Sequence, residues 1–146
     1  MIGKGIVAGF VATLVLSALM LMKSAMGVMP AFNAIKDWVT ILAGLGLPAT
    51  PLIGWIAHLI LGSVVWGALF AAVEPRLPGG AVASGTVFGV LAWLGMMVVF
   101  MPWAGNGLFA LGIGPMAAVA TLVLHIIYGA VLGAAFAKVT DANAMA

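Results

Sequence analysis

The chain contains two histidines, His58 and His125, and each is followed four residues later by a glycine, at Gly62 and Gly129. Both histidines lie in long apolar segments, where an ionisable side chain is costly and is by default a functional candidate. Two imidazoles at similar depth are suited to bind a haem iron from both sides. Each glycine lies one helical turn from its histidine on the same helix face, and we expect it to leave room for a flat macrocycle. The pattern predicts a metal or cofactor site at these four residues, with haem b as the cofactor.

Other interpretations of the histidines stay open. Each imidazole can simply bond a neighbouring helix, through hydroxyl groups such as those of Thr121 or Ser63 or through a backbone carbonyl, and other metal or proton-carrying roles also fit the pattern. The paired histidines resemble those of membrane b-type cytochromes built as four-helix bundles. Those proteins commonly carry two haems and four histidines, whereas this chain has histidines for one haem. It also lacks an arginine pair for the propionates, for which only Lys23 and Lys36 are candidates.

Methionines gather near the ends of the spans that we assign to the outer side. They are Met20, Met22, Met26, Met29, Met96, Met97, Met101 and Met116. Thioethers together with imidazoles bind Cu(I). Methionine is also an ordinary packing residue, and these spacings do not form an i, i+4 ligand set. We therefore interpret the methionines as packing residues.

The rest of the sequence argues against enzymatic chemistry. It has no carboxylate inside a span, no Ser-His-Asp spacing and no phosphate-binding loop. The absence of cysteine excludes disulfides, thiolate metal sites and cysteine nucleophiles. The net charge of +2 comes from few, scattered residues, which does not fit a nucleic-acid surface. We expect a protein that is not an enzyme and has no nucleic-acid partner.

The composition requires a lipid environment. Hydrophobic residues make up 66% of the chain and charged residues 5%, whereas soluble domains carry about a quarter charged residues. Four apolar segments each have roughly the 20 residues that cross a ~30 Å hydrocarbon core. They cover about 6–22, 52–73, 81–101 and 115–137. The sequence predicts an all-α membrane protein, a four-transmembrane-helix bundle that forms a single transmembrane domain over residues 1–146.

Four spans place both termini on one side of the membrane. That side carries Lys4, Arg76 and Lys138, and the other carries Lys23 and Lys36. Because basic loops favour the cytoplasmic side, we expect both termini in the cytoplasm.

The segment 31–43, between the first two spans, has Asn33, Lys36, Asp37 and Thr40 near one face. This spacing fits a short helix on the outer surface, with an ordered loop as the alternative.

The two halves of the chain resemble each other. Met29-Pro30 closes the first span and Met101-Pro102 the third, and the two His-x-x-x-Gly patterns lie in the second and fourth. This favours two tandem helix-pair repeats related by an axis along the membrane normal. Small residues also recur every four positions, as in closely packed helices. We expect Gly9 of the first span to pack against Gly85 and Gly89 of the third.

The order Gly5–Thr13, then Met-Pro, then the His-x-x-x-Gly-x-x-x-x-Gly helix at His58–Gly67 resembles a family of small four-helix bacterial membrane proteins of unknown function. The resemblance implies four spans in the bacterial inner membrane and no particular activity. We expect a subunit of a larger membrane complex, such as an electron-transfer complex, that contacts lipid and other membrane subunits. The alternatives are a small transporter or channel for a metal ion, and a structural subunit without a cofactor.

Overall fold

The computed structural model describes residues 1–144, and this part of the chain folds entirely as helices and loops. Four helices are long and apolar enough to cross a bilayer: Ile2–Ala25, Pro51–Arg76, Ala81–Trp103 and Pro115–Asp141. These ranges contain the four predicted spans, so the prediction of an all-α, multi-pass membrane protein is confirmed.

The helices begin and end at residues suited to helix ends. After α1 (Ile2–Ala25), Gly27 has a φ of 65°, which ends the helical path where a side chain would be strained. The hydroxyl of Thr50 accepts a hydrogen bond of 3.3 Å from the backbone N–H of Ile53, which caps α3 (Pro51–Ile60). Proline at the first helical position costs no hydrogen bond, and α3 and α7 (Pro115–Ala144) both begin with one.

A π-helical turn interrupts both the second and the third span. The second span comprises α3, η1 (Leu61–Val65) and α4 (Trp66–Val73), and it ends with the 3-10 turn η2 (Glu74–Arg76). The third span comprises α5 (Ala81–Gly95), η3 (Met96–Phe100) and α6 (Met101–Trp103). The 3-10 turn η4 (Leu108–Ala110) lies in the loop between the third span and α7. In the π turns the backbone N–H bonds five residues back, from Trp66 to Leu61 and from Met101 to Met96. Such turns are rare and frequently lie at functional sites.

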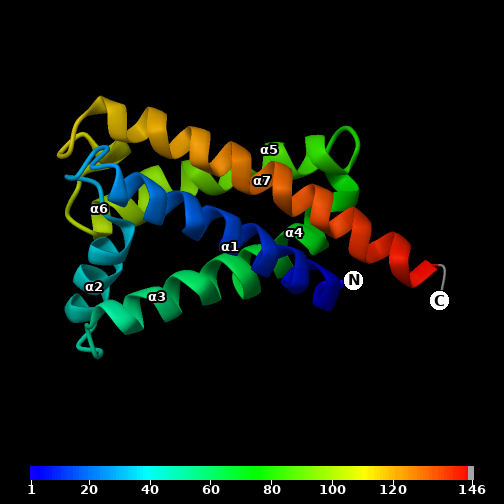
Figure 1. Cartoon of the computed structure of the whole chain (residues 1–146), viewed down its shortest axis with the longest axis horizontal. Helices are drawn as coiled ribbons and strands as arrows, with labels where there is room; N and C mark the ends of the chain where they lie inside the picture. Colours follow the sequence, from blue (N-terminus) through cyan, green and yellow to red (C-terminus); the bar gives the residue numbers. More distant parts are fainter. Residues whose placement is uncertain (145–146) are drawn as a thin grey trace.

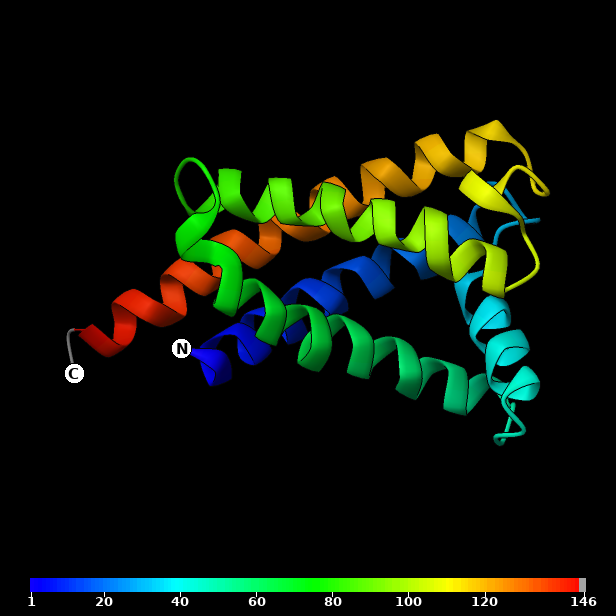
Figure 2. The same cartoon turned by 180° about the vertical axis from the view of Figure 1, so that it is seen from behind.

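The four spans form a bundle in which the helices pack closely at one end, while one helix diverges from the others towards the opposite end. Both termini lie at the same end of the bundle as the turn between α4 and α5 (Figure 1). We call this the terminal end. The opposite end, which we call the α2 end, holds α2 (Ala34–Gly44) and the loop before α7. α5 and α7 pack along much of their length and α1 packs against α7 and α4, whereas α3 diverges from α5 towards the α2 end (Figure 2).

The segment after the first span forms the predicted short helix. The side-chain oxygen of Asn33 accepts hydrogen bonds of 3.1 Å from the backbone N–H groups of Ile35 and Lys36, which caps α2. The assignment of Asp37 to a polar outer face was wrong. Asp37 is 7% exposed, because it lies under the loop before α7 and accepts a hydrogen bond of 3.0 Å from Asn106.

Glycines bring the helices into backbone contact within each half of the chain. A Cβ at Gly9 would lie 2.7 Å from the carbonyl oxygen of Ser63, and a Cβ at Gly85 would collide with the backbone of Gly129. The expected contact of Gly9 with Gly85 and Gly89 was therefore wrong. Each stripe faces the small residues of the following span instead, because only there can two backbones approach this closely. Both halves pack in the same manner, as two helix-pair repeats would.

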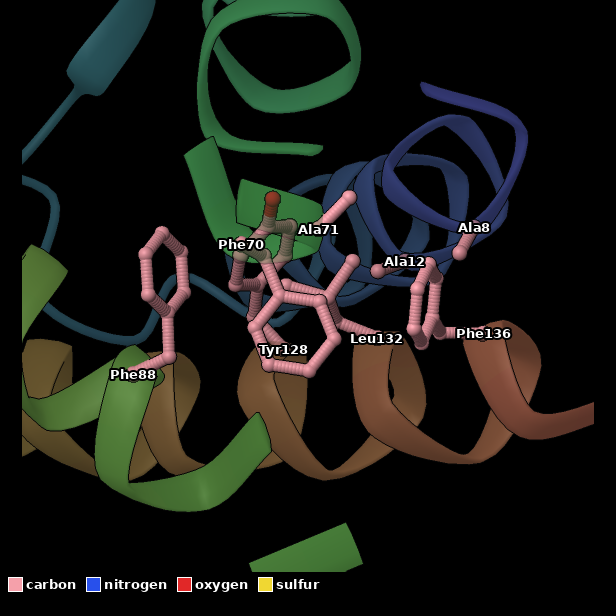
Figure 3. Close-up of a cluster of buried hydrophobic side chains, with 8 residues drawn as sticks. All are labelled: Ala8, Ala12, Phe70, Ala71, Phe88, Tyr128, Leu132 and Phe136. Carbon is pink, nitrogen blue, oxygen red and sulfur yellow. The ribbon is translucent and has the colours of Figure 1, made fainter. Parts of the chain in front are cut away.

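The terminal half of the bundle is filled by a cluster of apolar side chains from all four spans (Figure 3). Its members are Ala8, Ala12, Phe70, Ala71, Phe88, Tyr128, Leu132 and Phe136. The ring of Phe70 lies between those of Phe88 and Phe136, with centroid distances of 5.3 and 5.4 Å. These edge-on contacts are favourable geometries for aromatic pairs. The cluster fills the space between the four spans at the terminal end and does not extend to the α2 end.

Candidate functional site

A cavity of about 360 Å³ lies in the bundle, and both histidines line it. Its wall includes aromatic side chains from several elements: Phe32, Trp38, Trp66, Phe100, Trp103 and Tyr128. Tyr128 belongs both to this wall and to the core cluster, so the cavity begins where the core cluster ends and extends towards α2. Among the described residues that line it, none carries a formal charge. The structure thus places His58 and His125 on the wall of one cavity.

His125 is held by its own helix. Its Nδ1 lies 2.8 Å from the backbone oxygen of Thr121. Because a carbonyl oxygen only accepts, the Nδ1 atom carries the proton and donates it. The Nε2 atom of His125 then keeps its lone pair, and no described residue bonds it.

His58 is held by the first span. The hydroxyl of Ser17 donates a hydrogen bond of 2.7 Å to the carbonyl oxygen of Thr13, and the same hydroxyl lies 3.2 Å from Nε2 of His58. Since the single hydroxyl proton goes to the carbonyl, Nε2 of His58 donates to the Ser17 oxygen. The Nδ1 atom of His58 therefore keeps its lone pair. The ring of Trp55 packs edge-on against this imidazole, with a centroid distance of 5.7 Å.

The two imidazoles therefore have opposite tautomers, with the proton on Nε2 in His58 and on Nδ1 in His125. Each donates its proton to a fixed partner and retains one nitrogen with an unused lone pair. Fixing one ring nitrogen by a hydrogen bond orients the other, as in metal-binding histidines. The alternative that each histidine bonds a neighbouring helix is met for His58, through Ser17 rather than Ser63. It is not met for His125, which bonds a carbonyl oxygen of its own helix.

The π turn η1 shapes the cavity wall. In an α-helix the N–H of Trp66 would bond the carbonyl of Gly62, but here it bonds Leu61. This change leaves the oxygen of Gly62 open to the hydroxyl of Tyr128, which donates to it at 2.6 Å. Residues of the second π turn, including Met96 and Phe100, line the same cavity. Sequence reasoning missed both turns and Tyr128. The only sequence signal for one of them is Pro102, which lacks an N–H two residues after the end of η3.

The glycines that follow the histidines are occupied by neighbouring helices. A Cβ at Gly62 would collide with the side chain of Thr13, and a Cβ at Gly129 would collide with the backbone of Gly85. Their role in the structure is close helix packing. The space that we expected them to leave for a macrocycle is filled, although Gly62 still borders the cavity.

The two lysines expected near a propionate lie beside a different hollow. Lys23 donates hydrogen bonds from Nζ to the backbone oxygens of Met29 and Phe32, at 2.9 and 2.6 Å. Lys36 is exposed, and both lysines border a second hollow of about 490 Å³. Neither lines the cavity that holds the histidines.

The cavity reaches the surface of the third span. Val99 and Trp103 line the cavity and are 62% and 55% exposed, and both lie within the membrane span Ala81–Trp103. At the α2 end the ring of Trp38 covers Phe100, with a centroid distance of 4.9 Å. The cavity therefore opens sideways, towards the acyl chains or the interface of the membrane.

Comparison with known proteins places the chain in a family. Its whole length, residues 1–146, matches the model of the family of unknown function DUF6789. The chain belongs to this family. The membership agrees with the resemblance found in the sequence and with the four apolar spans of the structure. No curated protein and no solved structure matches the chain.

Proposed function

We propose that this chain is a non-enzymatic subunit of a larger membrane complex and that its bundle binds an apolar ligand or cofactor between His58 and His125. One observation carries the proposal: both imidazoles line the same cavity, and each keeps one nitrogen lone pair. Pockets for small molecules are typically apolar, roughly 300–1,000 Å³ in volume, with few polar groups, and this cavity lies at the lower end of that range.

A haem b is the cofactor that the paired histidines suggest, and the described residues meet part of its requirements. The free nitrogen lone pairs of His58 and His125 could hold a haem iron. The ring and its propionates have less support, because Gly62 and Gly129 are packed against other helices. None of the described residues that line the cavity is a lysine or an arginine. The proposal of haem b therefore rests on the two histidines alone.

Co-purification tests the proposal directly. The wild-type protein and the double variant His58→Phe/His125→Phe would be purified from the same membranes, and their organic extracts compared by mass spectrometry and by visible absorption. Phenylalanine fills a similar volume without a ring nitrogen. Exposed Ile126, one residue after His125, gives the control Ile126→Ala.

We expect a small molecule in about stoichiometric amount in the wild type and in Ile126→Ala, and its loss from the double variant. A Soret band lost with the histidines would identify the molecule as haem. Extracts with the same composition for all three proteins would contradict the proposal.

A specific observation favours a metal ion as a second candidate. The thioethers of Met20 and Met96 line the same cavity as the two imidazoles, and this ligand set is typical of Cu(I). A role in the transport of such an ion would follow. Anaerobic competition for Cu(I) against a chromogenic chelator tests it, and a double variant Met20→Leu/Met96→Leu with unchanged affinity would contradict it.

The same proposal includes the location of the chain. We propose the bacterial inner membrane, with both termini in the cytoplasm, on the support of the basic residues Lys4, Arg76 and Lys138 at the terminal end. The large apolar residues on the outside of the bundle suit contact with lipid and with other membrane subunits.

A further inference from the structure

We propose that the ligand of this cavity is a membrane-soluble aromatic molecule with hydroxyl groups, a phenol or hydroquinone, and that the two histidines bind its hydroxyl protons. The inference rests on the proposed function, since it names the class of ligand for the same site. The bundle leaves part of the hydrogen-bond capacity of the cavity wall unused.

Most donors around the histidines are already engaged. The hydroxyls of Thr13 and Thr121 donate to carbonyl oxygens of their own helices at 2.7 Å, and the hydroxyl of Tyr128 donates to Gly62. Both imidazole N–H groups are also bonded. At the histidines, the described residues therefore leave two acceptors unused, namely the Nδ1 atom of His58 and the Nε2 atom of His125. A ligand that satisfies them has to bring donors.

Among the described residues of the wall, the side-chain donors without a partner are indole N–H groups. Trp38, Trp66 and Trp103 line the cavity and have no hydrogen-bond partner among the described residues. A hydroxyl group can donate its proton to an imidazole and accept a bond from an indole, whereas a carbonyl oxygen can only accept. A hydroxyl therefore suits the wall better than a ketone or quinone oxygen does.

The shape and the position of the cavity point to an aromatic, lipid-soluble molecule. Six aromatic side chains line the wall, and aromatic rings pack favourably against one another in edge-on and offset arrangements. The opening at Val99 and Trp103 lies within a membrane span. A molecule dissolved in the bilayer reaches the histidines through this opening without crossing water.

Three probes with the same ring and tail separate hydrogen-bond donation from apolar fit. They are a decyl-substituted benzohydroquinone, its dimethyl ether and its quinone. Dissociation constants would be measured by isothermal titration calorimetry, under anaerobic conditions, for the wild-type protein in lipid nanodiscs. The variants are His58→Phe and His125→Phe. The control is Ile126→Ala, an exposed position on α7, the helix that carries His125.

We expect the hydroquinone to bind the wild type about tenfold more tightly than the ether or the quinone, since two buried hydrogen bonds of ordinary strength supply this ratio. Each histidine variant should lose most of the preference, and Ile126→Ala should keep it. Equal affinity for all three probes would overturn the inference but leave a ligand-binding cavity. Failure of all three probes to bind would overturn the inference as well, and the co-purification experiment would then decide separately whether another molecule occupies the site.

Discussion

The hydroxyl of Tyr128 on the fourth span donates a hydrogen bond of 2.6 Å to the carbonyl oxygen of Gly62 in the second. The bond exists because the π turn η1 shifts the N–H of Trp66 to Leu61. It joins two spans at the boundary between the core cluster and the cavity, where Tyr128 belongs to both. A local change in the backbone of one helix is thus matched by a side chain 66 residues later.

Removal of this bond should destabilise the bundle. Tyr128→Phe keeps the ring in the core cluster but leaves the Gly62 oxygen without its partner, which costs about 1–3 kcal/mol in a buried setting. Thermal unfolding in detergent, followed by tryptophan fluorescence, measures the loss. Thr86→Val is the matched control, because it removes a hydroxyl that bonds only Val82 of its own helix. Equal midpoints for Tyr128→Phe and the wild type would show that the bond contributes little.

Glycine-to-alanine substitutions should lower the free energy of unfolding where the glycine contacts another helix and leave it unchanged where space is open. A Cβ at Gly133 would collide with the backbone oxygen of Ala81 and lie 3.2 Å from Cα of Gly85. Since backbone atoms cannot move aside without separating α5 from α7, we expect Gly133→Ala to cost about 1–3 kcal/mol or more. Gly3→Ala is the control, since nothing lies within 4 Å of its Cβ position. A loss of stability in Gly3→Ala as large as in Gly133→Ala would contradict this account.

The buried carboxyl of Asp37 should make stability depend on pH. Burial raises the pKa of Asp37, while the hydrogen bond from Asn106 and the nearby charge of Lys36 partly oppose the rise. Its Oδ2 atom has no hydrogen-bond partner among the described residues. Because the folded state holds the proton more tightly than the unfolded state, the contribution of this group is greatest below its unfolded pKa of about 3.9 and is lost as pH rises through the folded pKa.

Asp37→Asn removes the charge and keeps an oxygen that can accept from Asn106. We expect the variant to be more stable than the wild type at neutral pH and to show a flatter profile of unfolding midpoint from pH 4 to 8. Asp141→Asn, at an exposed position, should leave the profile unchanged. A wild-type profile that rises with pH, or one that Asp37→Asn does not alter, would show that burial of this carboxyl is not the cause.

The two histidines should show opposite tautomers. With His58 protonated at Nε2 and His125 at Nδ1, nitrogen NMR of histidine-labelled protein should resolve two distinct patterns, and the chain has only these two histidines. His125→Phe assigns the remaining signals to His58. Ser17→Ala should release His58 to a mixture of tautomers, because its acceptor is lost. Detection of one tautomer for both rings would refute the assignment.

The direction of insertion can be tested with reporter fusions. Both termini lie at the same end of the bundle and the loop before α7 at the other (Figure 1). Reporters fused at the C-terminus and within the 103–114 loop should therefore label opposite sides of the membrane. We expect the C-terminal reporter in the cytoplasm, because basic residues gather at the terminal end and favour that side. A cytoplasmic loop reporter and an external C-terminus would reverse the proposed orientation.

The sequence by itself determined the class of fold and the two candidate histidines. Length and hydropathy of each segment fix the number of spans, since both are local properties that need no partner. The position of His58 and His125 in parallel spans then places them at similar depth. Local signals such as Asn33 and Pro51 also mark where helices begin.

Only the tertiary structure decided which faces meet. In water an apolar stripe identifies the buried face of a helix, but these spans are apolar on every side, so the pattern cannot distinguish a lipid-facing side from a packed one. The partners of Gly9 and Gly85, the burial of Asp37 and the filled space beside Gly129 depend on backbone distances between separate helices. The tautomers of the histidines and the bond from Tyr128 to Gly62 depend on them too, because a hydrogen bond across the bundle exists only once the helices have packed.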